Sequence, residues 1–142
     1  METSIKYLVD TNIWLERLLG QNKSEVVSEF LNATPTSQIF ISDFALHSIG
    51  VILSKLKKLD ILERFITDLF INGQIEQVTL DEDDFFNIIS NIEIYNLDFD
   101  DSYQLTASRK YVMTIVTFDK DFNIDGINKQ SPEEIISKIK GN

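Results

Sequence analysis

Short apolar runs alternate with stretches of helical periodicity along the whole chain, and this alternation most restricts the possible folds. The apolar runs lie at residues 5–9, 38–41, 75–80 and 113–117, and each has the length of a buried strand. The segments between them carry apolar residues three and four positions apart, which is typical of amphipathic helices. Strands that alternate with helices predict an α/β fold, with a mostly parallel central sheet flanked by helices.

The expected helices begin at residue types that cap helices well. Asp, Ser, Thr and Asn side chains accept a hydrogen bond from a free N–H of the first turn, and proline suits the first helical position. We expect helices after Asp10, from about Ser24 to Asn32, after Ser42-Asp43, after Asp60, after Asp81, from Asp100 to near Tyr111, and from Pro132 to Ile139. In the helix after Asp81 we expect four apolar side chains to lie in the core: Phe85, Phe86, Ile88 and Ile89.

The 142 residues contain no low-complexity linker and no internal repeat, so we expect one domain over residues 1–142. Cysteine is absent, which excludes disulfides and thiolate metal sites. No apolar run approaches the roughly 18 residues of a membrane span, and residues 1–6 lack the pattern of a signal peptide. We therefore expect a cytoplasmic protein with no membrane partner.

The net charge of −10 restricts the partners of the chain. It argues against sequence-independent binding of nucleic acid through a basic surface, because such binding draws its affinity from released counterions. It is compatible with an enzyme whose acidic pocket is neutralised by divalent cations, and also with a basic partner. Charge alone does not choose between these two interpretations.

Three aspartates are expected at one edge of the predicted sheet. Asp10 directly follows the first strand, and Asp119 comes two residues after the strand that ends at Thr117. Asp101 lies at a helix N-terminus, where a carboxylate is electrostatically favoured. Because ligands of such sheets bind at the carboxyl ends of the strands, this edge is the expected functional edge.

Converging carboxylates repel one another unless a cation lies between them, and a divalent ion with oxygen ligands meets that need. Such an ion lowers the pKa of a bound water and stabilises the charge on a phosphate. The pattern therefore suggests metal-assisted hydrolysis of a phosphodiester. Any one of these aspartates taken singly is more often a helix cap, and only the set of three on one edge favours a metal site.

The segments that carry these residues resemble the PIN-domain nucleases. The resemblance rests on residues 9–14 (VDTNIW), 97–102 (LDFDDS) and 115–122 (IVTFDKDF), followed by residues 131–136 (SPEEII). Each piece is short, but their order and the chain length match a whole PIN domain. The resemblance implies a Rossmann-like fold and a ribonuclease that depends on Mg²⁺ or Mn²⁺. Many small members resemble the toxin half of a toxin–antitoxin pair, the VapC-like group.

The resemblance also implies roles for individual residues. Asp10 matches the first metal-binding aspartate of the family, Asp101 the third acidic position and Asp119 the fourth, with Asp121 as a nearby support or substitute. These carboxylates would orient the metal and the attacking water. We expect five further side chains to support the site: Asn12, Asp43, His47, Ser48 and Thr117.

One position departs from the family pattern. Ser48 stands where the family usually carries a glutamate, and serine is a far weaker metal ligand than a carboxylate. Three outcomes follow from this difference: Asp43 or His47 partly replaces the glutamate, the metal binds more weakly, or the chain is not catalytic.

The implied partners are an RNA substrate and an antitoxin-like protein, and homodimers are common among similar proteins. The densest basic groups are expected near RNA phosphates, although such residues ordinarily form a solvated helix face. These residues are Lys55, Lys57, Lys58, Arg109 and Lys110.

Other interpretations fit the sequence less well. The main alternative is a catalytically inactive PIN-like module that binds RNA or protein. It is suggested by Ser48, which stands where the family usually carries a glutamate. A phosphohydrolase with an aspartate nucleophile would need a second aspartate at position 12, where this chain has Asn12. The segment from Asp121 resembles the start of an EF-hand loop, but its twelfth position is Pro132 instead of a glutamate.

Overall fold

A five-stranded parallel sheet forms the centre of the molecule in the computed structural model, which describes residues 4–122 and 124–141 apart from the side chain of Asp121. The strand order is β3-β2-β1-β4-β5. The strands are β1 (Tyr7–Val9), β2 (Ile39–Ser42), β3 (Glu76–Val78), β4 (Thr114–Val116) and β5 (Lys129–Gln130). Because β1 pairs with both β2 and β4, the residue that follows β1 lies at the middle of the carboxyl edge.

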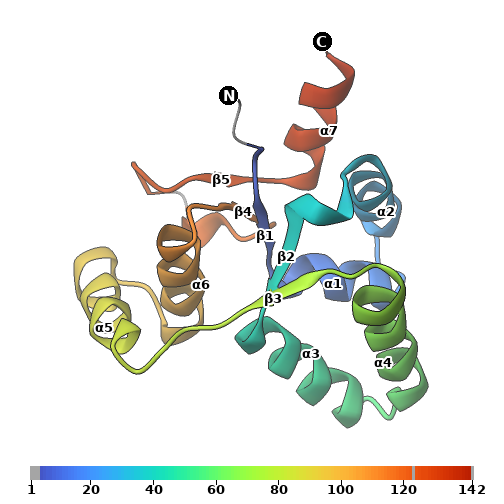
Figure 1. The fold of residues 1–142 in the computed structure, drawn as a ribbon, viewed down its shortest axis with the longest axis horizontal. Coiled ribbons are helices and arrows are strands. Elements are labelled where there is room, and N and C mark those ends of the chain that lie inside the picture. The colour runs from blue at the N-terminus through green and yellow to red at the C-terminus, as the bar shows by residue number, and fades with distance from the viewer. Residues whose placement is uncertain (1–3, 123, 142) are drawn as a thin grey trace.

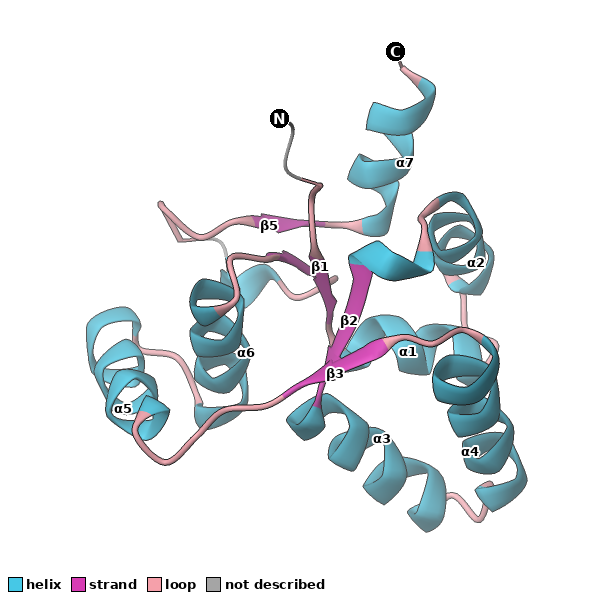
Figure 2. Ribbon diagram, in the orientation of Figure 1, coloured by secondary structure: helices cyan, strands magenta, loops and turns pink. Residues whose placement is uncertain are grey.

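Helices cover both faces of this sheet (Figures 1 and 2). Figure 1 shows α1, α2, α3 and α4 to one side of the strands and α5 and α6 to the other. The helices are α1 (Thr11–Leu18), α2 (Ser24–Ala33), α3 (Asp43–Lys55), α4 (Leu59–Ile66), α5 (Asp84–Tyr95), α6 (Phe99–Lys110) and α7 (Pro132–Lys140), with the short helices η1 (Thr36–Gln38), η2 (Thr67–Asn72) and η3 (Lys120–Phe122).

Alternate residues of β1 face the two layers of helices, as the period of two of a strand requires. Tyr7 and Val9 belong to a large core that includes Ile13 of α1 and Phe30 of α2. Leu8 points to the other face, into a smaller core with Phe40 of β2 and Ala107 of α6. All three residues of β1 are buried, and β1 is therefore a strand covered on both faces.

The predicted α/β fold is confirmed, and its differences from the structure have local causes. Three of the four predicted strands are shorter than their apolar runs, and β2 has the predicted length but lies one residue further along the chain. The helix expected from Asp100 begins at Phe99 because the Asp98 side chain caps it. The helix expected after Asp60 continues beyond α4 as the π-helical η2 and ends before Gly73. The fifth strand, β5, was not predicted because its two residues are polar and half-buried.

The prediction that Phe85, Phe86, Ile88 and Ile89 all lie in the core is wrong for three of them. Ile88 is fully buried, whereas Phe85, Phe86 and Ile89 are 44%, 72% and 51% exposed. The segment does form a helix, as its spacing of apolar residues predicts. However, α5 packs mainly against α6 on the outside of the fold, so only a narrow row of its side chains is buried.

No helix in the described residues is long and apolar enough to cross a membrane.

Candidate active site

Asp10 lies at the carboxyl end of β1 and caps helix α1. Its backbone N–H donates to the carbonyl of Val116 at 2.9 Å, which extends the pairing of β1 with β4 by one residue. The side chain is only 8% exposed. Sheet pairing and helix capping together thus bury a carboxylate at the middle of the functional edge.

Three neutral donors hold the Asp10 carboxylate. Oδ1 accepts hydrogen bonds from the backbone N–H of Thr11 at 2.8 Å and from Nε2 of Gln104 at 3.0 Å. Oδ2 accepts one from the hydroxyl of Thr117 at 2.9 Å. Since each carboxylate oxygen has about two lone-pair sites, these contacts leave one acceptor site on Oδ2 within the described residues.

Thr117, one of the predicted supporting residues, connects the ends of β1 and β4. While its hydroxyl donates to Asp10, its Oγ1 accepts from Nδ2 of Asn12 at 3.2 Å and from the backbone N–H of Asp119 at 2.9 Å. The Asn12 carbonyl oxygen in turn accepts from the backbone N–H of Phe118 at 3.4 Å. These bonds fix the loop that carries Asp119 against the start of α1.

Gln104 and Ser42 belong to the same network, and the sequence did not indicate either as a site residue. Gln104 is 2% exposed, and its Oε1 accepts from the hydroxyl of Ser42 at 2.7 Å while its Nε2 donates to Asp10. The Ser42 hydroxyl also caps α3 by accepting from Ala45. The one available sequence signal was the place of Gln104 on α6, one helical turn after Asp101.

The surroundings of Asp10 raise the pKa of its carboxyl group. Burial is the main cause, and the negative charge of Asp119 acts in the same direction. The hydrogen bonds from Gln104, Thr117 and Thr11 oppose it, because they stabilise the ionised form. Asp10 and Asp119 are therefore close enough to interact electrostatically.

Asp101 and Asp119 are both half-buried and come from different elements of the same edge. Asp101 lies in the first turn of α6, where its backbone N–H donates to the Asp98 carboxylate at 2.8 Å. Asp119 follows β4, and the side chain of Asp121, two residues on, lies outside the described residues. Among the described side chains, which do not include that of Asp121, no three acidic or histidine residues form a group ready to hold a metal ion.

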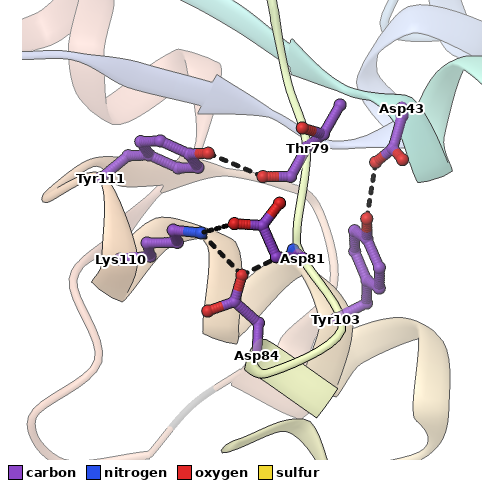
Figure 3. Close-up of polar contacts among 7 residues, drawn as sticks. All are labelled: Asp43, Thr79, Asp81, Asp84, Tyr103, Lys110 and Tyr111. Atoms are coloured by element: carbon purple, nitrogen blue, oxygen red, sulfur yellow. Dashed lines mark hydrogen bonds and ion pairs between the residues drawn. The ribbon is translucent and has the colours of Figure 1, made fainter.

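The three candidates on α3 differ in their surroundings. Asp43 is the first residue of α3, and its Oδ1 accepts from the Tyr103 hydroxyl at 2.6 Å (Figure 3). Ser48 is half-buried and His47 is exposed on the same helix. Burial and the Asp43 carboxylate raise the pKa of Tyr103, so this phenol stays a hydrogen-bond donor and joins α6 to the start of α3.

The basic residues singled out from the sequence lie away from this edge. Lys55 ends α3, about 18 Å along the helix axis from Asp43 at the usual rise per residue, and Lys57 and Lys58 follow it, exposed. Arg109 and Lys110 end α6. Arg109 donates to Asn91 and Tyr95, and Lys110 pairs with Asp81 and Asp84.

A different set of lysines surrounds Asp119. A shallow pocket of about 300 Å³ lies beside the end of β4, and its lining includes Lys23, Lys120 and Lys129 together with Asp119. Lys23 directly precedes α2, and its ammonium group lies 4.7 Å from the centre of the Phe118 ring. These three lysines come from separate segments of the chain, so no basic run in the sequence predicted that they would lie together.

Replacing Gln104 with leucine is expected to destabilise the folded protein. The change leaves the Ser42 hydroxyl and one hydrogen-bonding site of Asp10 unpaired in a buried region, which costs about 1–3 kcal/mol of unfolding free energy. Urea denaturation followed by circular dichroism measures it. Ser90→Ala, at an exposed position of α5, serves as the control, and an unchanged midpoint for Gln104→Leu would show that the network contributes no stability.

Comparison with known proteins agrees with the α/β fold of the chain. The family model described as "PIN domain" matches residues 7–124, which is most of the chain. The chain belongs to the PIN-domain family. The match spans the sheet edge with Asp10, Asp101 and Asp119, so the resemblance expected from the sequence is confirmed.

Solved structures show the same PIN fold at low sequence identity. A toxin–antitoxin complex from Klebsiella pneumoniae has a TM-score of 0.71 at 22% identity, covering 89% of this chain and 98% of that chain. VapC20 of Mycobacterium tuberculosis, a sarcin–ricin loop cleaving toxin, has a TM-score of 0.73 at 15% identity, covering 86% and 96%. FitAcB from Neisseria gonorrhoeae has a TM-score of 0.71 at 20% identity, covering 89% and 98%. No curated protein sequence matches the chain.

The donors at the PIN-domain edge suit a small divalent ion. All are oxygen atoms, and Mg²⁺ typically takes one or two carboxylates and fills its other positions with waters and substrate phosphate. Oδ2 of Asp10 offers an acceptor site, and Asp119 adds a second negative charge nearby. The chemistry of this donor set therefore fits the divalent ions that PIN-domain nucleases generally use.

Proposed function

We propose that this PIN domain is a metal-dependent endoribonuclease that hydrolyses RNA phosphodiester bonds and acts as the toxin of a toxin–antitoxin pair. The observation that carries the proposal is the buried Asp10 carboxylate at the centre of the carboxyl edge, held by neutral donors and within electrostatic reach of Asp119. Two like charges kept together in this way are stabilised by a bound cation.

Each residue has a distinct part in the proposed reaction. Asp10, Asp101 and Asp119 would hold Mg²⁺ or Mn²⁺, with Asp121 as a support, and these carboxylates would orient the attacking water. When bound, the ion supplies a more acidic water and stabilises negative charge on the phosphate. Gln104 and Thr117 keep Asp10 in place through their hydrogen bonds.

The lysines beside Asp119 are better placed for RNA than those chosen from the sequence. Lys23, Lys120 and Lys129 line the pocket that contains Asp119, whereas Lys55, Lys57 and Lys58 lie at the far end of α3 and beyond it. We propose that the first set contacts a phosphate next to the scissile bond, because phosphate contacts position a nucleic acid. RNA as the substrate agrees with the sarcin–ricin loop cleavage by the similar toxin from M. tuberculosis.

An antitoxin protein is the partner that the structural neighbours suggest. One of them is a toxin–antitoxin complex from K. pneumoniae, and two others, FitAB and VapBC2 from Rickettsia felis, are bound to DNA fragments. We extend this partner to the present chain as part of the proposal, together with a cytoplasmic location and homodimer formation.

A catalytically inactive PIN module remains the second candidate. One observation favours it: Ser48 occupies the usual glutamate position. Such a module would bind RNA or a protein without cutting.

Cleavage of a structured RNA by the purified protein separates the two candidates. We expect cutting with Mn²⁺ or Mg²⁺ and none with a chelator, because both the nucleophile and the phosphate charge depend on the ion. Gel analysis of the products measures the rate, and calorimetry with Mn²⁺ measures binding of the ion. A folded protein that binds no ion and leaves the RNA intact under all conditions would favour the inactive module.

A further inference from the structure

Helix α5 exposes an apolar face that no other part of the described structure covers. Phe85, Ile89 and Phe86 follow one another around one side of the helix and are 44%, 51% and 72% exposed. On the opposite side of the helix, Ile88 and Asn91 are the buried residues that face the fold. Large apolar side chains gathered on one surface generally mark an interaction site.

Phe99 of α6 continues this face. Its ring is 43% exposed and lies 6.0 Å from the Phe85 ring, measured between ring centres. Behind it the Tyr103 ring is 6.3 Å away and buried, and the Tyr103 hydroxyl is bonded to Asp43. We call Phe85, Phe86, Ile89 and Phe99 the aromatic face. Because it rests on an anchored row of rings, it offers a preformed surface.

The charge around the aromatic face has one sign. Between Arg64 and Arg109 the chain has ten acidic residues and no Lys, Arg or His, while the remainder carries thirteen residues of each sign. The whole net charge of −10 therefore originates in the segment that contains α5 and the start of α6. Glu82, Asp83 and Glu93 are exposed acidic residues of this segment that make no ion pair within the described residues.

The two cations at the end of α6 are already engaged within the fold, and one of them, Arg109, donates to Asn91 and Tyr95 of α5. Figure 3 shows Lys110 between Asp81 and Asp84, at 3.4 Å and 2.7 Å, and the Tyr111 hydroxyl bonded to the carbonyl of Thr79. These contacts fasten the turn before α5 to the end of α6. Glu82, Asp83 and Glu93 are therefore available to pair with cations of another molecule.

We propose that the aromatic face binds a basic segment of a partner protein, whose apolar side chains pack on the rings while its Lys or Arg side chains meet the acidic residues around them. Charge complementarity selects this occupant. A second copy would bring two acidic segments together, and RNA phosphates would meet the same repulsion. The inference deepens the partner part of the proposed function, but it does not require nuclease activity.

A synthetic peptide tests the proposal on the intact protein. The probe is a fluorescein-labelled amphipathic peptide with leucine at helical spacing and arginine elsewhere; one control peptide replaces each leucine with serine. We expect saturable binding of the leucine peptide that weakens with salt, and weaker binding of the serine peptide. Phe86→Ser should raise the Kd by at least about tenfold, the effect of losing one buried anchor.

Matched variants separate the aromatic face from general charge attraction. Ile94→Ser lies on the same helix at 70% exposure but outside the aromatic face, and it should change the Kd by less than about twofold, as a surface substitution away from the contact does. Glu82→Gln combined with Asp83→Asn should weaken binding and reduce its salt dependence. Circular dichroism verifies that every variant is folded.

Three outcomes would overturn the proposal. One is equal peptide binding by Phe86→Ser and the unchanged protein. Another is a dimer seen by light scattering that Phe86→Ser dissolves, which would assign the face to a second copy. The third is displacement of the peptide from this face by a single-stranded RNA. Because peptide binding needs neither metal nor cleavage, failure of this test and failure of the nuclease proposal are distinguishable.

Discussion

Replacing Asp10 with asparagine is expected to lower metal-dependent RNA cleavage by more than about a hundredfold, beyond the loss typical of a residue that merely supports a ligand. Asparagine keeps the size of the side chain but removes the negative charge that would attract the ion. Its amide group would also face the Thr117 hydroxyl, which now donates to Oδ2. Single-turnover cleavage measured at saturating Mn²⁺ gives the change in rate.

The fold of the Asp10→Asn variant is expected to persist. Burial raises the pKa of the Asp10 carboxyl, so the ionised group is a cost to the folded state at neutral pH, and asparagine removes that cost. Asp60→Asn, in the first turn of α4 and exposed, is the matched control and should cleave at the original rate. If Asp10→Asn cleaves as fast as Asp60→Asn, Asp10 is only a helix cap and the proposed site is wrong.

Replacing Ser48 with glutamate is expected to tighten Mn²⁺ binding by about tenfold or more, because affinity for such ions grows with the number of charged ligands. Ser48 lies about 8 Å along α3 from Asp43 at the usual rise per residue. Helical side chains lean toward the N-terminus of their helix, so a glutamate here would extend toward the carboxyl edge. Calorimetric titration with Mn²⁺ measures the affinity, and RNA cleavage measures whether the rate follows.

Ser54→Glu is the matched control for Ser48→Glu. It places the same charge on the same helix at an exposed position near the far end, and it should leave Mn²⁺ affinity within about twofold, since an exposed charge at that distance is screened by salt. An inactive wild-type protein that gains cleavage only with Ser48→Glu would identify the serine as the cause of the inactivity. Equal affinities for the two variants would mean that position 48 does not face the metal.

Local patterns in the sequence were enough to predict the sheet, its parallel direction and the edge that carries Asp10. The runs around Leu8 and Ile115 are apolar on both faces of their strands, which identifies buried parallel strands without further information. Asp10 could be assigned to the carboxyl edge because it directly follows one of these runs and is a residue type that begins a helix. These inferences depend only on residues close together in the sequence, because strand burial and helix capping are governed by local residue types.

The hydrogen-bond network around Asp10 could not be predicted, because its members are distant in the sequence. Gln104 and Thr117 lie 94 and 107 residues from Asp10, and a glutamine in a helix gives no local sign that it will be buried against a carboxylate. The same holds for Lys23, which precedes α2 but lines the pocket that contains Asp119, far later in the sequence.

Burial of α5 was predicted wrongly for a related reason. A helical pattern of apolar residues shows that a helix has an apolar face, but the number of neighbouring elements determines how much of that face is covered. Because α5 packs mainly against α6, Ile88 is enclosed while Phe86 stays exposed. Residue type and spacing along the chain therefore specify the strands, the helices and the acidic edge, whereas contacts between distant segments specify the donors that hold Asp10 and the aromatic face that remains open.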